Sequence, residues 1–418
     1  MLLVLSFVFF MLLGLPLFGV IGLASIISMI GMPFPMEFIP QNLYTGMDQF
    51  PLIATIGFVM AGFLMEPAGI TGEIIEVAKK AVGNIRGGLA MVTILACMIF
   101  AALSGSGPAT TAAIGSIMIP GMIAAGYRKD DAAAVSATGG TLGILIPPSN
   151  PMIIYGVVAN TSIAGLFMAG FIPGFVLTSL MCITAYCIAK KRGYQGTNEK
   201  FSIVGLCKAI WDGKWALATP AIILGGIYSG MLTATESAAI AVVWAAIAGL
   251  FIYKELTVKE LVPILKDSAK SSAMILFIIA ASTAFSWVFT FSGASQALVN
   301  AVISMHLNSA LFCFVVAIIL LIFGTFMEGT AIAVLLVPVL WPIAQSMGID
   351  VIHFGMIVCI SNVVGTMTPP VAVNIFSAST VSGLKMGDIA KAEIPFLIGY
   401  VAVFFCCVFS ETFCTFLI

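Results

Sequence analysis

The sequence predicts an all-α polytopic membrane protein, built as an inverted-topology repeat with two re-entrant helical hairpins and two proline-broken spans. Three observations lead to this fold class: an apolar composition, a segregated distribution of cations, and a repeated pattern of glycine and proline. The chain has 418 residues, of which 61% are hydrophobic and 8% are charged. Soluble domains carry about 25% charged residues. Its apolar runs are long and continuous rather than alternating, which favours helical spans over a β-barrel.

Cations are confined to a few stretches of the chain. Cytoplasmic loops collect positive charge, so we expect these stretches, and the N-terminus, on the cytoplasmic side. Residues 2–30 are expected to form a first span that is retained, because no basic segment precedes them. The 17 lysine and arginine residues fall in five groups, at residues 79–86, 128–129, 190–214, 254–270 and 385–391.

The segment between Arg86 and Arg128 must then enter and leave the membrane on one side. Two ordinary spans would do this, but their turn would lie in water and should be polar. The turn is instead the compact Ser-Gly-Ser-Gly-Pro at residues 104–108. Irregular backbone at membrane depth is tolerated where it is buried in protein or lines a cavity. A re-entrant hairpin therefore fits as well or better.

Glycine and proline recur at matched positions in the two halves of the chain. A shift of 222 residues superimposes six of them without a gap. About one coincidence is expected by chance, so we interpret the pattern as an internal repeat. These residues are closely tied to backbone shape, so the halves should share geometry. The pairs are Gly107 and Gly329, Pro120 and Pro342, Gly126 and Gly348, Gly143 and Gly365, Pro147 and Pro369, and Pro148 and Pro370.

Charge also gives the orientation of the two halves. Cations bracket the first hairpin, whereas no lysine or arginine lies from Ser271 to Leu384, and Asp350 follows the second hairpin. The first hairpin should therefore open to the cytoplasm and the second to the opposite side. Inverted repeats of this kind usually carry a transport site near the membrane midplane, formed by discontinuous helices.

This pattern predicts five parts of the chain. Residues 254–270, which are amphipathic, are expected to form an interfacial helix before a span at 271–291. The parts are 1–66 (N-terminal scaffold spans), 67–160 (first repeat of the transport domain, with hairpin 88–125 and broken span 131–160), 161–270 (connecting scaffold spans and interfacial helices), 271–384 (second inverted repeat, with hairpin 308–347 and broken span 352–383) and 385–418 (final span).

The two hairpin tips and the two Pro-Pro breaks are expected to converge. Broken helices expose amides that favour anions and carbonyls that, with hydroxyls, favour Na⁺. Neutral oxygen donors suit a hard monovalent cation. The first group is Ser104, Gly105, Ser106 and Gly107, facing Thr141, Gly143, Pro147, Ser149 and Asn150. The second is Thr325, Glu328, Gly329 and Thr330, facing Asn362, Gly365, Thr366, Thr368, Pro369 and Asn374.

Plainer interpretations exist for each motif. Small residues often pack between membrane helices, and a single Pro-Pro is commonly a kink. Their pairing in both halves favours the functional interpretation. Glu328 is an ionisable side chain at an expected mid-membrane tip, so it is a functional candidate by default. It would bind Na⁺, carry a proton, or lie in an aqueous vestibule.

Other chemistry has little support in the sequence. The nine cysteines form no CxxC pair, and His306 and His353 belong to no HExxH motif, so a transition-metal site is not expected. No P-loop and no nucleophile–base constellation is present, which argues against an enzyme. Nothing indicates nucleic acid as a partner. A channel stays open as an alternative, because broken helices and hairpins also occur in pores.

Several motifs, in order, carry a resemblance to a known family. They are SGSGPATTAAIGSIMIPGM, GGTLGILIPPSNPMIIYGVVANTSI, LFMAGFIPG, IAKKRGY, GGIYSGMLTATESAAIAV and GTMTPPVAVNIF. Together they cover essentially the whole chain, which resembles the large membrane subunit of tripartite ATP-independent periplasmic (TRAP) transporters, the M or DctM type.

The resemblance implies a Na⁺-coupled secondary importer in the bacterial inner membrane. It implies an elevator architecture similar to that of the ion-transporter superfamily. The expected partners are a separate small four-helix membrane subunit, a periplasmic substrate-binding protein, a small organic acid and lipid. The segments YTGMDQFPLIA and YGVVANTSIAGLFMAGFIPG resemble sialic-acid members, so sialic acid is favoured over a C4-dicarboxylate. The first tip resembles the generic family pattern. The nearest rival is a Na⁺/dicarboxylate carrier that works alone.

The resemblance also implies ligands by motif. The Na⁺ candidates are Ser104, Ser106, Gly143, Pro147, Asn150, Thr325, Gly329, Gly365, Thr366, Thr368 and Pro369. From the chemistry of the tips and breaks rather than from the resemblance, the candidates for contact with the solute are Ser104, Gly105, Ser149, Asn150, Glu328, Asn362 and Asn374. No lysine or arginine belongs to either set, so an anionic solute would rest on helix N-termini, hydroxyls and bound Na⁺.

Overall fold

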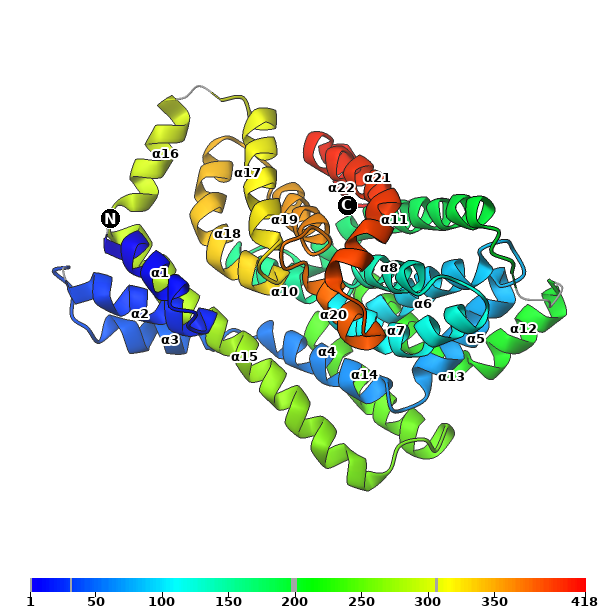
Figure 1. Cartoon of the computed structure of the whole chain (residues 1–418). Coiled ribbons are helices and arrows are strands. Elements are labelled where there is room, and N and C mark those ends of the chain that lie inside the picture. Colours follow the sequence, from blue (N-terminus) through cyan, green and yellow to red (C-terminus); the bar gives the residue numbers. More distant parts are fainter. Residues whose placement is uncertain (1, 31, 197–200, 305–306) are drawn as a thin grey trace.

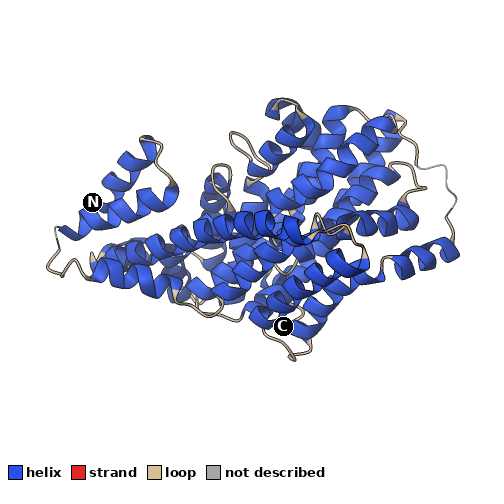
Figure 2. Cartoon of the chain, turned by 90° about the horizontal axis from the view of Figure 1, so that it is seen from below, coloured by secondary structure: helices blue, strands red, loops and turns tan. Residues whose placement is uncertain are grey.

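Helices make up all the regular structure that the computed structural model describes, over residues 2–30, 32–196, 201–304 and 307–418 (Figure 2). Within these residues seven helices are long and apolar enough to cross a membrane, or eight with the bent pair Phe38–Met47 and Leu52–Met65. The predicted class, an all-α polytopic membrane protein, is confirmed.

The N-terminal region differs from the prediction. In place of one span over residues 2–30, two short helices, α1 (Leu2–Leu12) and α2 (Leu17–Ile30), pack against each other. Gly14, with a φ of 73°, turns the chain, and Pro16 cannot continue the helix before it. Helices α3 (Phe38–Met47) and α4 (Leu52–Met65) follow, with a 55° bend between them.

The first repeat holds a hairpin and a broken helix. Helix α5 (Ile70–Val82) precedes it, with Glu73 in its first turn and Lys79 and Lys80 in its last. The hairpin is formed by α6 (Gly88–Ser104) and α7 (Gly107–Ala124), and each of these arms is about 25 Å long at 1.5 Å per residue. The broken helix consists of α8 (Lys129–Gly140), α9 (Leu142–Leu145) and α10 (Asn150–Val158).

Connecting helices separate the repeats. They are α11 (Ile163–Arg192), α12 (Ile203–Asp212), α13 (Lys214–Tyr228), α14 (Ala234–Ile247) with the π-helical turn η1 (Ala248–Ile252), and α15 (Val258–Phe291). Helix α15 runs along one edge of the molecule (Figure 1). It is continuous through Lys270, so the expected interfacial helix and span are one helix. Its 34 residues span about 51 Å, more than the ~30 Å hydrocarbon core of a bilayer.

The second repeat has the same element order as the first. After α16 (Ala294–Ser304), the hairpin is α17 (Ser309–Gly324) and α18 (Gly329–Ser346), and the broken helix is α19 (Val351–Gly365) and α20 (Val373–Ser382). Helices α21 (Met386–Phe409) and α22 (Glu411–Thr415) end the chain. Gly126 and Gly348, which follow the two hairpins at the 222-residue offset, both have positive φ, at 87° and 74°.

The two repeats pack against each other through exchanged contacts. Helix α10 of the first lies against α18 of the second, and α20 of the second lies against α7 of the first. Tyr155 and Ser377 occupy equivalent positions in the repeats and both donate across the boundary. Tyr155 Oη donates to the carbonyl of Val351 at 2.6 Å, and Ser377 Oγ donates to that of Pro108 at 2.9 Å. The repeats therefore form one body around their tips.

Candidate functional site

The tip of the first hairpin lies directly on the first break. The backbone N–H of Asn150 donates to the carbonyl of Gly105 at 3.2 Å. A Cβ atom at Gly143 would be 2.7 Å from the carbonyl oxygen of Ser106, closer than real Cβ contacts. Only glycine at 143 allows this approach, which is why the tip and the break are in contact.

The second hairpin meets the second break in the same way. The N–H of Ala372, the repeat equivalent of Asn150, donates to the carbonyl of Thr325 at 3.0 Å. A Cβ at Gly365, the equivalent of Gly143, would be 2.6 Å from the Cα of Gly324. Glycine thus permits both contacts, and the matched geometry supports the inference of a structural repeat.

Each tip also touches the other repeat. The amide of Asn374, in α20, lies beside Gly107 of the first tip, where a Cβ would be 2.9 Å from its nitrogen and its oxygen. Gly329 of the second tip leaves no room for a Cβ beside Asn362, and such an atom would be 3.1 Å from Cγ of Pro151. Both tips and both breaks therefore converge on one region, as the sequence predicts.

Four helices begin in this region: α7, α10, α18 and α20. Their N-cap residues are Ser106, Ser149, Glu328 and Ala372, and none of the four side chains accepts a bond from its own helix. In contrast Asn308 caps α17 through the N–H of Leu311 at 2.7 Å. Uncapped N-termini present amides and a partial positive charge to an anion.

Three asparagine side chains in the region lack hydrogen-bond partners among the described residues. They are Oδ1 of Asn150 and both polar atoms of Asn362 and Asn374. All three residues are buried, at 4%, 0% and 0% exposure. An unsatisfied buried amide costs about 1–3 kcal/mol, and such groups require an explanation. A bound solute or ion that supplies the missing partners would be one.

Four hydroxyl groups of the region differ from these amides, because their protons already take part in hydrogen bonds. Thr366 donates to the carbonyl of Val363 at 3.0 Å, and Ser149 donates to that of Ile144 at 2.5 Å. A hydroxyl oxygen that donates its proton keeps lone pairs for a cation. Thr325 and Thr368 likewise donate to carbonyls of the helices that precede them, at 2.8 Å each.

The candidates differ in exposure. Ser106 and Thr368 are half-buried, and Glu328 and Pro369 are exposed, so the second tip and break are more open than the first. Glu328 therefore differs in exposure from the buried asparagines, although it directly precedes Gly329 at the tip. The buried candidates are Ser104, Gly105, Gly143, Pro147, Ser149, Asn150, Thr325, Gly329, Asn362, Gly365, Thr366 and Asn374.

Sequence reasoning missed two residues that support the first break. The hydroxyl of Thr110, one turn into α7, lies 2.7 Å from that of Ser104. Tyr400, fully buried in α21, donates to the carbonyl of Thr138 at 2.7 Å and lies 2.6 Å from the hydroxyl of Thr141. Thr110 could have been found from the sequence, because it follows Ser106 by four residues and donates to its carbonyl at 2.8 Å. No sequence signal points to Tyr400, because it is distant in the chain.

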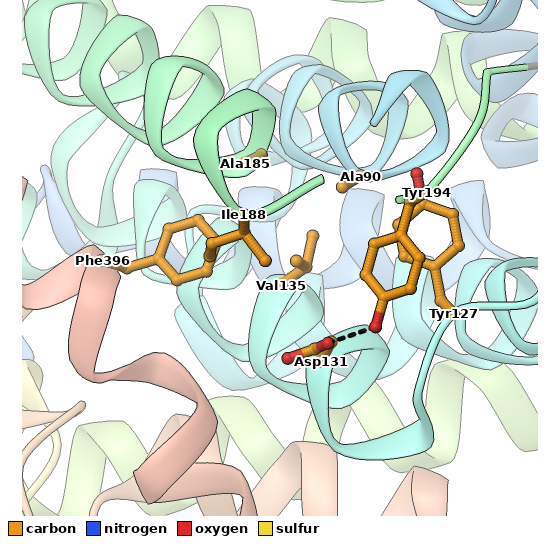
Figure 3. Close-up of a pocket in the computed structure, with 8 residues that line it drawn as sticks. All are labelled: Ala90, Tyr127, Asp131, Val135, Ala185, Ile188, Tyr194 and Phe396. Atoms are coloured by element: carbon orange, nitrogen blue, oxygen red, sulfur yellow. Dashed lines mark hydrogen bonds between the residues drawn. The ribbon is translucent and has the colours of Figure 1, made fainter. Parts of the chain in front are cut away.

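A second polar cluster lies at the start of α8 (Figure 3). Asp131 is buried, forms an ion pair with Arg192, and accepts a bond from Tyr194 Oη at 2.5 Å. The ring of Tyr194 stacks on Tyr127, with centroids 4.2 Å apart. The adjoining cavity of about 10 Å³ has room for about one water molecule. The cluster ties α11 to α8 and brings together two of the predicted cytoplasmic groups of cations.

Comparison with known proteins shows the family of this chain. The model of the DctM component of tripartite ATP-independent periplasmic transporters matches residues 4–412. The chain belongs to this family. It is therefore a multi-pass membrane permease subunit of a TRAP importer, and a transporter rather than an enzyme, as predicted.

TRAP permeases named for different substrates are similar to the chain. The C4-dicarboxylate large permease protein DctM of Pseudomonas aeruginosa is 40% identical, over 85% of this chain and 83% of its own. The sialic acid large permease protein SiaM of Vibrio cholerae is 36% identical, over 87% and 85%. The isethionate permease protein DctMQ of Oleidesulfovibrio alaskensis is 37% identical over 95% of this chain, which spans 63% of that relative.

A solved structure supports the fold alone. The YdaH transporter of Alcanivorax borkumensis matches with a TM-score of 0.65 over 98% of each chain, at 15% identity. This likeness agrees with the predicted all-α fold class.

Proposed function

We propose that this TRAP permease subunit imports a small organic acid across the bacterial inner membrane, coupled to Na⁺ and by an elevator movement of the two repeats. The observation that carries the proposal is the convergence of two hairpin tips and two helix breaks on three unpartnered buried asparagines. Discontinuous helices at an inverted-repeat interface are the usual setting of coupled ion and solute sites.

Na⁺ fits the donors that meet there. The donors are neutral carbonyl, hydroxyl and amide oxygens, the ligands preferred by hard cations. In the first group they come from Ser104, Ser106 and the residues 143–150. In the second group they come from Thr325, Gly329 and the residues 365–369. Asn150, Asn362 and Asn374 add amide groups whose hydrogen-bonding capacity is unused.

The solute would be anionic and small. No lysine or arginine lies between Ser271 and Leu384, so its carboxylate would meet uncapped helix N-termini and co-bound Na⁺. Ser104, Gly105, Ser149, Asn150, Asn362 and Asn374 are the proposed contacts. Glu328 is kept as a candidate at the open edge. Sialic acid is favoured and a C4-dicarboxylate comes next, and a relative named for each of these substrates is similar to the chain.

Two partners complete the proposed importer. A small four-helix membrane subunit would pair with this chain, in keeping with the DctMQ name of one relative. A periplasmic binding protein would deliver the solute. We place the N-terminus and the cation groups in the cytoplasm by the positive-inside rule. The alternatives are a carrier that works alone and a channel.

Uptake into proteoliposomes tests the proposal. The vesicles would contain this chain with its small subunit, a cognate binding protein outside, and labelled sialic acid or succinate. Uptake that needs both an inward Na⁺ gradient and the binding protein is expected. Uptake that needs Na⁺ alone would support the stand-alone carrier, and Na⁺ flux without solute would support the channel.

A further inference from the structure

Helix α18, the second arm of the second hairpin, contains two prolines in its interior, Pro338 and Pro342. Pro338 has no N–H, so it cannot donate the usual helix bond to the carbonyl of Val334, four residues before it. Val334 is buried, at 2% exposure. A buried carbonyl without a donor is costly, so the helix requires a partner from outside.

The partner comes from α15. Oγ of Ser282 donates a hydrogen bond to the carbonyl of Val334, and Ser282 is 1% exposed. Within the part of the chain that the structure describes, no other side-chain hydrogen bond joins α15 to α18. The bond therefore supplies at this point what the proline removes.

Helix α15 belongs structurally with the N-terminal helices. It packs against α2, α3 and α4. Gly46 of α3 leaves no room for a Cβ beside the side chain of Thr283, so α3 and α15 are in close contact. The bond from Ser282 thus joins this N-terminal group of helices to a hairpin whose tip lies at the candidate site.

The two helices also pack against each other, but not along their whole length. A cavity of about 490 Å³ lies between α15 and α18, with α3 and the end of α10 as its other walls. Ser286 and Thr290 continue the face of Ser282 along the cavity, opposite Pro338. Ser286 makes no side-chain hydrogen bond among the described residues. On the side of the cavity, the bond from Ser282 is therefore the polar link between the hairpin and α15.

We propose that Ser282 is a positioning residue for transport: its hydroxyl latches the second hairpin to α15 in this conformation and releases it when the repeats move. The inference rests on the proposed elevator movement, in which α15 stays with the fixed helices. Release leaves the carbonyl of Val334 without its donor, so the latch sets how often the repeats leave this position.

Distances between spin labels on α15 and α18 test the latch. Labels at Met274→Cys and Gln345→Cys, both exposed, would be placed after the exposed Cys187, Cys207 and Cys406 are changed to serine. Ser282→Ala is expected to lower the population of the present distance relative to other distances by about tenfold, the factor for one good hydrogen bond. Ser282→Thr, which keeps a hydroxyl, should stay close to the parent.

Two further variants separate the latch from a general loss of stability. Ser286→Ala, one turn along the same face, should leave the distances unchanged. Pro338→Ala restores an N–H to the carbonyl of Val334, so adding Ser282→Ala to it should have little further effect. An unchanged distance distribution in Ser282→Ala, even with a lowered melting temperature, would overturn the latch. Failure of Na⁺-driven uptake by the parent would instead refute the proposed function.

Discussion

The side-chain amide of Asn374 lies against the backbone of Gly107, so that a Cβ at 107 would be 2.9 Å from both its nitrogen and its oxygen. The break of one repeat is thus fitted to the hairpin tip of the other. This contact joins the two halves at the site, because a movement of the first tip displaces a polar group that belongs to the second repeat.

Replacing Gly107 with alanine should displace Asn374 and impair uptake. Overpacking a buried contact costs about 1–3 kcal/mol, which would appear as a large loss of transport rate with modest loss of stability. The matched control is Gly121→Ala in the same helix, where a Cβ meets nothing within 4 Å. Initial uptake rates at equal protein in the membrane measure the difference. Equal rates for the two variants would contradict the proposed fit.

Ser106 and Thr366 offer hydroxyl oxygens from the two repeats. Ser106→Ala and Thr366→Ala each remove one proposed neutral ligand, so the Na⁺ concentration for half-maximal uptake should rise roughly tenfold, as for a contribution of about 1.4 kcal/mol. Expression should stay near that of the parent. Uptake as a function of Na⁺ concentration is the measurement, and an unchanged half-saturation in both variants would remove these residues from the ion site.

The cluster around Asp131 should contribute to stability rather than to transport specificity. Asp131→Asn weakens bonds to Arg192 and Tyr194, and hydrogen bonds to charged groups contribute about 1.5–3 kcal/mol. Asp130→Asn is the control, because its pair with Arg128 is largely exposed on the arginine side and exposed pairs contribute little. The two variants are compared by thermal unfolding in detergent. If Asp130→Asn lowers the unfolding temperature as much as Asp131→Asn does, the stabilising role of the Asp131 cluster is refuted.

Glu73 should make the stability of the α5 contact depend on pH. Partial burial first, and then the charges of Asp212, Glu76 and Glu255, raise the pKa of Glu73 above 4.5. The folded chain then binds the proton more tightly than the unfolded chain, so stability falls as pH rises through the folded pKa.

Glu73→Gln removes that titration. The variant should unfold at a higher temperature than the parent at about pH 8, and the advantage should vanish at about pH 4, where both forms of the parent are protonated. Asp267→Asn, in an exposed pair with Lys270, should show no such trend. The measurement is the unfolding temperature at the two pH values. If Glu73→Gln raises it equally at both, burial of the Glu73 carboxylate is not the cause.

The hairpins and breaks could be predicted because glycine and proline fix backbone shape locally. Helices end and restart at Ser104 and Gly107, and again at Gly324 and Gly329, close to the expected tips. Gly14 and Pro16 are local turn signals, but the continuous apolar run around them predicts one long span. Charged residues hid the continuity of α15, although its capping box at Thr257 and Glu260 marks the helix start.

Contacts between the repeats could not be predicted in the same way. The bond from Ser377 to Pro108 joins residues 269 positions apart, and nothing local specifies it. The same holds for Tyr400 at the first break and for Ser282 at Val334. These contacts follow from how the repeats and the N-terminal helices dock, so the sequence indicates the residues of the site but not what holds them.

The central claim is that the unpartnered asparagines of the converged tips belong to a Na⁺-dependent site. The most direct measurement is thermal unfolding of the purified chain in Na⁺ or in K⁺ at equal ionic strength, for the parent, Asn362→Leu and Asn374→Leu. Binding to the folded state stabilises it, by about 2.7 kcal/mol at a hundredfold excess over Kd. Na⁺ should raise the unfolding temperature of the parent and not that of either variant, although both variants should be as stable as the parent in K⁺. An equal rise in all three proteins, or none in the parent, would contradict the account.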